Sequence, residues 1–183
     1  MKHSVLFLIL LVIGCNTKLD PFPVKHHQTI DGRPYIVGKI NRENLLQYEH
    51  SSWFLSEYEK FKVPKDWVKK NSSLLNKMTL KLFLGTWCED SEREVPGMLK
   101  LIDYSGFNYD KLQMFAVSED KHTPENYEKG LNITNVPTLI FYLNGKEINR
   151  FVEFPIVSLT KDLEDIIQGK SYQNPYFQID INE

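Results

Sequence analysis

Short apolar runs alternate with a helical pattern in the middle of the chain. Residues 80–84 (LKLFL) and 112–117 (LQMFAV) have the length and composition of buried strands. Between them, residues 91–102 carry Val95, Met98 and further apolar side chains at helical spacing. Strands joined by a crossover helix run parallel. This stretch therefore predicts one unit of strand, helix and parallel strand.

The second half of the chain predicts a hairpin and a closing helix. The Asn-Gly pair at residues 144–145 is a strong two-residue turn signal, and it lies between strand-like runs at residues 139–143 and 147–152. Apolar residues at helical spacing predict a last helix over residues 156–168. A Thr-Pro pair predicts a further short helix over residues 123–130. Together with the first unit, this order predicts a mixed sheet flanked by helices.

The segment before this unit predicts two helices. Asn41 can cap a helix over residues 42–62, and Pro64 is suited to begin a second one. The first helix has one apolar face, formed by Leu46, Trp53, Phe54, Tyr58 and Phe61. The second is predicted to bury Trp67, Val68, Leu74 and Leu75. We interpret these side chains as core residues that pack on the later unit rather than as a platform for a ligand.

The N-terminus has the pattern of an export signal. Lys2 precedes an apolar run at residues 5–13 (VLFLILLVI), far shorter than the roughly 20 residues that span a bilayer. The run ends in Gly14 and Cys15 and resembles the lipobox of bacterial lipoproteins. The resemblance implies cleavage before Cys15, a lipid on its thiol and a place in the bacterial cell envelope, facing the periplasm or another extracytoplasmic space. An ordinary signal peptide with a nearby cysteine is the alternative.

A polar stretch follows the export signal. Residues 16–34 contain three prolines and show no apolar period, so we interpret residues 15–40 as a lipidated N-terminus and linker. His26 and His27 are adjacent, which makes their side chains point apart, and no cluster of further ligands follows. The sequence therefore predicts no metal site here.

A second resemblance concerns residues 85–96, GTWCEDSEREVP. Trp87 and Cys88 lie where the first core strand gives way to its helix, and Pro96 lies eight residues beyond Cys88. A Val-Pro-Thr string at residues 136–138 precedes the hairpin. These features resemble the reactive cysteine, helix-kinking proline and cis-proline loop of the thioredoxin family. The string W-C-x-D-S also resembles a bacterial subgroup with serine in place of the second cysteine.

This resemblance covers about residues 78–170 and implies a thioredoxin-like fold, α/β with a central mixed β-sheet flanked by helices, here with an N-terminal helical extension. The predicted segments are a signal peptide (1–14), a lipidated N-terminus and linker (15–40), a helical extension (41–77), a thioredoxin-like domain (78–170) and a C-terminal tail (171–183).

The position of Cys88 at a helix start favours nucleophilic chemistry. Unpaired N–H groups and the helix dipole stabilise a thiolate there, whereas the neighbouring Glu89 and Asp90 oppose it. Ser91 lies one helical turn on, so its hydroxyl can donate a hydrogen bond to the thiolate but cannot resolve a mixed disulfide. The resemblance also places Leu82 where the family has a buried acid that assists the second cysteine. Both parts of a dithiol cycle are therefore replaced.

The loop at residues 136–138 is the predicted substrate contact. If Pro137 is cis, the backbone of Val136 lies beside Cys88, and an extended substrate can pair with it, with Thr138 completing the loop. Parallel topology puts residues 118–122 at the same sheet edge. Lys121 or His122 from that loop can raise the local positive potential, or the loop is simply solvated.

Composition narrows the function classes. The 183 residues carry 22 Lys+Arg against 24 Asp+Glu, a formal charge of -2, and no run of five basic residues, so nucleic-acid binding is not indicated. With Cys15 lipidated, Cys88 is the single free thiol, which is unusual in an oxidising compartment and fails the ligand count of a zinc site. No cofactor is predicted.

Three hypotheses remain. The first is a membrane-anchored protein that exchanges thiols and disulfides of envelope proteins through Cys88 alone, as an isomerase or by mixed-disulfide tethering. The second is a non-catalytic lipoprotein that binds a peptide or partner in the Pro137 groove. The third is a scaffold lipoprotein that docks through its N-terminal helices.

Overall fold

The computed structural model describes residues 20–47 and 50–177 of the chain. The predicted signal peptide and the proposed lipidation site, Cys15, lie outside these residues. Six strands form one sheet in the order β1-β2-β4-β3-β5-β6. The strands are β1 (Lys25–Gln28), β2 (Pro34–Ile40), β3 (Thr79–Leu84), β4 (Leu112–Ala116), β5 (Thr138–Leu143) and β6 (Lys146–Val152).

The centre of the sheet follows the predicted pattern. β3 runs parallel to β4, and β5 and β6 form an antiparallel hairpin that joins the other side of β3. Asn144 and Gly145, the two turn residues, have φ of 53° and 79°, as a tight hairpin turn requires. The helices are α1 (Arg42–Leu45), α2 (His50–Lys60), α3 (Lys65–Leu75), α4 (Glu89–Tyr104) and α5 (Leu159–Ile167), and residues Tyr109–Lys111 form a 3-10 turn.

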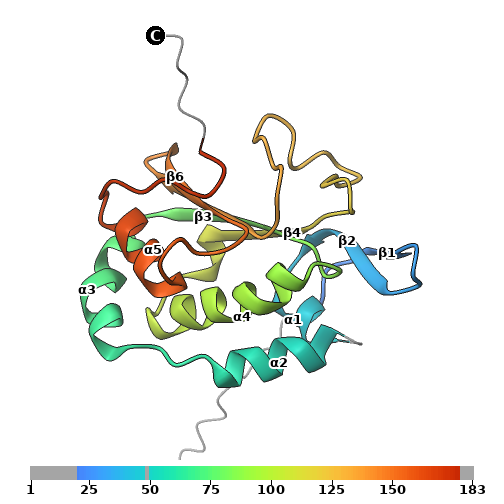
Figure 1. The fold of residues 1–183 in the computed structure, drawn as a ribbon, viewed down its shortest axis with the longest axis horizontal. Helices are drawn as coiled ribbons and strands as arrows, with labels where there is room; N and C mark the ends of the chain where they lie inside the picture. Colours follow the sequence, from blue (N-terminus) through green and yellow to red (C-terminus); the bar gives the residue numbers. More distant parts are fainter. Residues whose placement is uncertain (1–19, 48–49, 178–183) are drawn as a thin grey trace, which may run out of the picture.

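One face of the sheet carries the main core and the helices (Figure 1). Alternate residues of β3 point to this face, so Leu80, Leu82 and Leu84 are all buried against helix α4 and its neighbours. Helix α2 packs against α4, and α3 against α5. The Lys100 side chain of α4 donates to the carbonyl groups of Tyr58 and Phe61, 2.6 and 2.9 Å away. The predicted helical extension therefore forms part of the core.

The opposite face carries a second, smaller core covered by a loop. Phe83 of β3 and Phe115 of β4 stack with ring centroids 4.9 Å apart, and Tyr127 stacks on Phe115 at 4.6 Å. The predicted helix over residues 123–130 is wrong, because this stretch forms successive turns. The Thr123 hydroxyl accepts from the Tyr127 N–H at 2.8 Å, and such side-chain bonds compete with a helix.

The expected linker contains a hairpin. Residues 25–28 and 34–40 are strands β1 and β2, and β2 pairs antiparallel with β4, so the interpretation of residues 15–40 as a linker is wrong for this part. The hairpin turn closes through the Thr29 N–H and the Arg33 carbonyl at 2.9 Å. Gly32 in this turn has a φ of 85°, which suits glycine. The exposed, polar β1 gave no apolar period to detect.

Two of the predicted helices have different bounds, and one predicted core residue is exposed. The expected helix at residues 42–62 is two helices, although Asn41 does cap the first with a reciprocal capping box. Leu74 is exposed rather than buried. The last helix begins at Leu159 instead of residue 156, because the Ser158 hydroxyl caps it by accepting from the Lys161 N–H at 3.2 Å.

Within residues 20–47 and 50–177, every helix is too short or too polar to cross a bilayer.

Candidate functional site

Cys88 is the N-cap residue of helix α4. Strand β3 ends at Leu84, and four residues later Cys88 adopts an extended backbone (φ -99°, ψ 121°) from which the helix starts. Its thiol is half-buried and makes no disulfide. The free N–H groups of the first helical turn lie beside this position, as the sequence predicted.

The loop before β5 faces this thiol. The peptide bond between Val136 and Pro137 is cis, as the resemblance implied. The Cys88 thiol donates a hydrogen bond to the Val136 carbonyl, with 3.3 Å between Sγ and the oxygen. Thr138 is buried, and its hydroxyl donates to the Asn135 carbonyl at 2.6 Å, which holds the loop on the start of β5. The structure thus brings Cys88 together with the predicted substrate loop.

Trp87 forms one wall of the site and is fixed by three contacts. Its Nε1 donates to the Val117 carbonyl at 2.9 Å, and its own carbonyl accepts from Arg33 at 3.1 Å. The Lys121 ammonium lies 5.6 Å from the centre of the indole ring. Lys121 therefore lies where the sequence placed it, at the edge that carries Cys88. His122 instead turns to Glu128, with 3.1 Å between the ring nitrogen and the carboxylate.

Ser91 has a different contact from the one predicted. Its side chain is fully buried, and the hydroxyl oxygen accepts a hydrogen bond from the Gly85 N–H at 3.1 Å. Within residues 20–47 and 50–177, no hydrogen bond joins this hydroxyl to the Cys88 thiol. In this state Ser91 fixes the backbone that precedes Cys88.

An open hollow of about 380 Å³ surrounds the thiol. We call it the Cys88 hollow; its lining consists of Arg33, Trp87, Cys88, Glu89, Asp90, Lys121, Asn135, Val136 and Glu153. It therefore holds two cationic and three acidic side chains. Burial raises the pKa of the adjacent Glu92 carboxyl, and the Glu89 charge adds to this while Arg33 opposes it. Asp90 is ion-paired with Arg93, so part of the acidic charge is compensated.

Three residues of the hollow were absent from the sequence prediction. Arg33 reaches it because of the hairpin that was interpreted as linker, and the Asp-Gly pair at residues 31–32 was a signal that could have revealed that turn. Asn135 and Glu153 flank the predicted strands, and no local pattern distinguishes them from other loop residues. Among the described residues, no three His, Cys, Asp or Glu side chains gather as metal ligands would.

Comparison with known proteins also finds a thioredoxin-like relative. The chain is 26% identical over 86 residues to a thioredoxin-like protein of Acanthamoeba polyphaga mimivirus, covering 47% of this chain and 60% of the relative. The resemblance of the sequence to the thioredoxin family led us to expect three features that the structure has: the parallel β3–β4 pair, the β5–β6 hairpin and a cis proline facing Cys88. The fold is thioredoxin-like. No family model matches the chain.

Solved structures are similar to this chain at low sequence identity. An HIV epitope-scaffold is 12% identical with a TM-score of 0.51, and the match covers 66% of this chain and 86% of the scaffold. Thioredoxin of Fasciola hepatica is 23% identical with a TM-score of 0.37, covering 57% of this chain and 92% of that protein. The chain spans 60% of the length of the mimivirus relative. These likenesses concern the fold alone.

Proposed function

We propose that this protein exchanges thiols and disulfides through one cysteine, Cys88, without a resolving cysteine. The observation that carries the proposal is the 3.3 Å hydrogen bond from the Cys88 thiol to the Val136 carbonyl at a helix N-terminus. This places the sulfur beside a backbone segment that can hold a substrate chain. Ser91, one helical turn away, offers no second sulfur.

The chemistry balances without an external oxidant or reductant. The Cys88 thiolate attacks one sulfur of a substrate disulfide, forms a mixed disulfide and releases the other substrate sulfur as a thiolate. A different thiolate of the same substrate then attacks the mixed disulfide, which forms a new substrate disulfide and returns Cys88 as thiolate. The number of disulfides is unchanged, so the reaction is an isomerisation. If no substrate thiolate attacks the mixed disulfide, it persists as a tether.

Two cations of the Cys88 hollow support the attacking step. Arg33 and Lys121 lie in the same hollow as the sulfur, and positive charge favours a thiolate over a thiol. Arg33 is held in place by its bond to the Trp87 carbonyl at 3.1 Å. The glutamate and aspartate residues of the lining act in the opposite direction.

The partners that this proposal requires are envelope proteins with thiols or disulfides. The apolar run at residues 5–13 and the following Gly14-Cys15 pair support export and a lipid on Cys15, which would anchor the domain to a membrane. Expression of the full chain in a bacterium tests this. Incorporation of labelled fatty acid that disappears in Cys15→Ser is expected, whereas equal labelling of that variant, or none in either protein, would refute the lipid anchor.

The exchange reaction is tested with a substrate whose disulfides are scrambled. The full chain carrying Cys15→Ser, with Cys88 as its single thiol, is expected to redistribute the disulfide isomers while the total thiol count stays constant. The matched control is the same chain with Cys88→Ser. Equal rates of rearrangement with and without Cys88 would remove the basis of the proposal.

A non-catalytic binding module is the second candidate, and one observation favours it. The Cys88 thiol is half-buried, and Glu89 and Asp90 beside it disfavour a further negative charge. If the protein is a binding module, the chain with Cys88→Ser should bind peptide as strongly as the wild type does. Neither protein should then rearrange the scrambled substrate.

A further inference from the structure

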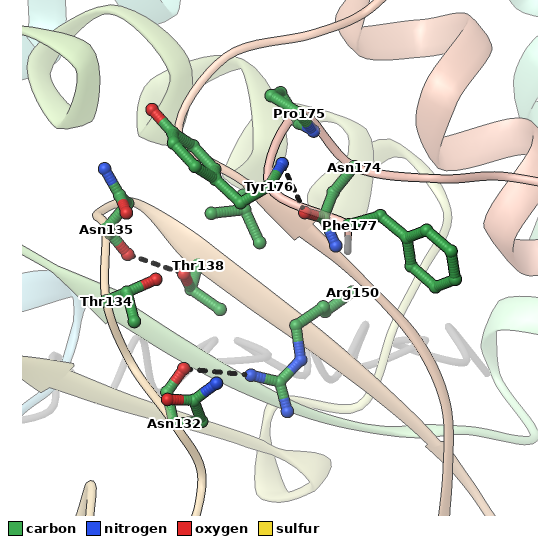
Figure 2. A pocket seen from close by; sticks show the side chains of 10 residues that line it. Asn132, Thr134, Asn135, Thr138, Arg150, Asn174, Pro175, Tyr176 and Phe177 are labelled. Carbon is green, nitrogen blue, oxygen red and sulfur yellow. Dashed lines mark hydrogen bonds between the residues drawn. The ribbon is translucent and has the colours of Figure 1, made fainter. Parts of the chain in front are cut away.

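A second hollow, of about 780 Å³, lies beside the C-terminal end of the described chain. One wall is the loop before β5, with Asn132, Thr134 and Asn135, and the other is the segment 174–177 (Figure 2). The Arg150 side chain of β6 lies between these walls. We call this the tail hollow, because the segment that closes it follows the last helix of the fold.

The tail hollow adjoins the Cys88 hollow. Asn135 lines both of them, and it directly precedes Val136, whose carbonyl accepts from the thiol. A second link runs through Tyr176, whose hydroxyl is hydrogen-bonded to the Glu153 carboxylate. Glu153 lines the Cys88 hollow and Tyr176 the tail hollow. A chain joined to Cys88 can therefore continue into the tail hollow.

The polar groups of the tail hollow are available to a ligand. Within residues 20–47 and 50–177, the side chains of Asn132, Thr134 and Asn135 make no hydrogen bond to protein. They can therefore donate to, and accept from, a bound backbone or a neutral polar side chain.

The tail hollow presents little net charge. The one charged residue of its lining, Arg150, holds the Glu147 carboxylate through two bonds of 2.7 Å. A third nitrogen of Arg150 donates to the Leu131 carbonyl at 2.7 Å, which leaves this guanidinium occupied by protein groups. A ligand that relies on charge finds no free partner among these residues.

Exposed aromatic rings complete the site. Tyr176 and Phe177 keep 44% and 54% of their surface accessible. Their segment is fixed by a local turn, since Asn174 accepts from the Tyr176 N–H at 3.0 Å and from the Phe177 N–H at 3.0 Å. A fixed backbone presents the two rings at low entropic cost, so they can cover a bound chain.

We infer that the tail hollow binds the polypeptide chain next to the reacting cysteine of the substrate, and that it selects segments of neutral, hydrogen-bonding residues. The inference rests on the proposed function, because Cys88 delivers the chain to the tail hollow. It adds the substrate class: a polypeptide with Asn, Gln, Ser or Thr near its cysteine, rather than a small disulfide or a strongly charged segment.

The test compares disulfides that share one leaving group. The full chain with Cys15→Ser is reacted with cysteine-containing peptides carrying thionitrobenzoate on sulfur, and release of coloured thionitrobenzoate follows attack by Cys88. One peptide has Asn, Ser and Thr on both sides of its cysteine, one has Lys and Asp there, and the reference is a blocked single cysteine. The neutral peptide is expected to react about tenfold faster than the reference, because one to two net hydrogen bonds in the tail hollow stabilise its complex by about that factor.

Variants assign this advantage to the tail hollow. Thr134→Val and Phe177→Ala are expected to reduce the rate with the neutral peptide by about three- to tenfold, the worth of one such contact. Their rate with the blocked cysteine stays that of the wild type, because neither residue lines the Cys88 hollow. The matched control is Tyr104→Ala, an aromatic residue exposed at the far end of helix α4, which changes neither rate.

The outcomes separate the two proposals. No reaction of the folded protein with any of the three disulfides overturns the proposed function. Normal reaction with the blocked cysteine, but no advantage for the neutral peptide, overturns the tail-hollow inference alone. An advantage that survives in Thr134→Val and Phe177→Ala overturns it as well, and equal preference for the charged peptide contradicts the substrate class.

Discussion

Replacing Ser91 by alanine should lower the stability of the fold without disabling the thiol. The Ser91 hydroxyl is fully buried, and it is the acceptor for the Gly85 N–H at 3.1 Å. Gly85 lies just beyond the end of β3, where no neighbouring strand supplies a carbonyl in its place. Ser91→Ala therefore leaves a buried backbone donor without a partner.

The cost of this change follows from that missing partner. An unsatisfied buried donor costs about 1–3 kcal/mol, and the better helix propensity of alanine returns a few tenths of a kcal/mol. In a domain of this size, each kcal/mol lowers Tm by about 2–4 °C. Ser91→Ala should therefore lower the melting temperature by about 2–10 °C, measured by thermal unfolding under reducing conditions.

Ser105→Ala is the matched control. Ser105 is also a buried serine associated with α4, but its hydroxyl donates to the Leu101 carbonyl at 2.8 Å, which already accepts the Ser105 N–H at 3.1 Å. Its removal leaves no orphaned backbone group, so its free energy of unfolding should change by less than about 1 kcal/mol.

The same pair of variants tests what Ser91 does for Cys88. Because the structure connects Ser91 to Gly85 rather than to the thiol, Ser91→Ala should alkylate Cys88 at the wild-type rate well below its melting temperature. A variant with unchanged stability and much slower alkylation would refute the reasoning, since the hydroxyl would then act on the sulfur, as the sequence first suggested.

Three other substitutions give further tests. Asp103→Asn removes a carboxylate that pairs with Arg42, so unfolding in denaturant should show a loss of about 2 kcal/mol. Burial raises the pKa of the Glu94 carboxyl, so its ionised form lowers the stability of the fold at neutral pH. Glu94→Gln should therefore melt at a higher temperature than the wild type at pH 7. This difference in melting temperature should disappear as the pH falls through the raised pKa towards 4.5. Gly85→Ala places a methyl group 2.7 Å from the Trp87 ring, so tryptophan fluorescence should shift and stability should fall by about 1–3 kcal/mol.

Local patterns were sufficient for the centre of the fold. The apolar runs that became β3 and β4 and the Asn-Gly turn of the last hairpin are encoded within short windows, so their type and order were confirmed. The turns over residues 123–130 depend partly on a contact outside the window, because Tyr127 stacks on Phe115 of β4. Within the window, the Glu128 carboxylate accepts from the Thr123 N–H at 3.0 Å. The tertiary stack and this local side-chain hydrogen bond together override the helical signal of a Thr-Pro pair.

Part of the candidate site could likewise be predicted from the sequence, and part could not. The meeting of Cys88 and Val136 was predicted through the resemblance, because the motif spacing fixed both positions. Arg33 could not be placed, because the strand that delivers it, β2, is paired with a strand more than 70 residues later in the chain. Glu153 and the tail segment reach the site through the path of the chain after β6, which no periodicity describes.

The most direct test of the central claim follows the fate of the mixed disulfide. The reduced full chain with Cys15→Ser is mixed with two peptides joined by a single disulfide, quenched in acid and weighed by mass spectrometry over time. We predict that Cys88 carries one of the two peptides as a mixed disulfide while the other peptide is released as a free thiol. The adduct should persist until an excess of external thiol is added, since the chain has no second thiol to release it. The absence of an adduct on the folded protein, while the unfolded chain reacts, would contradict the account.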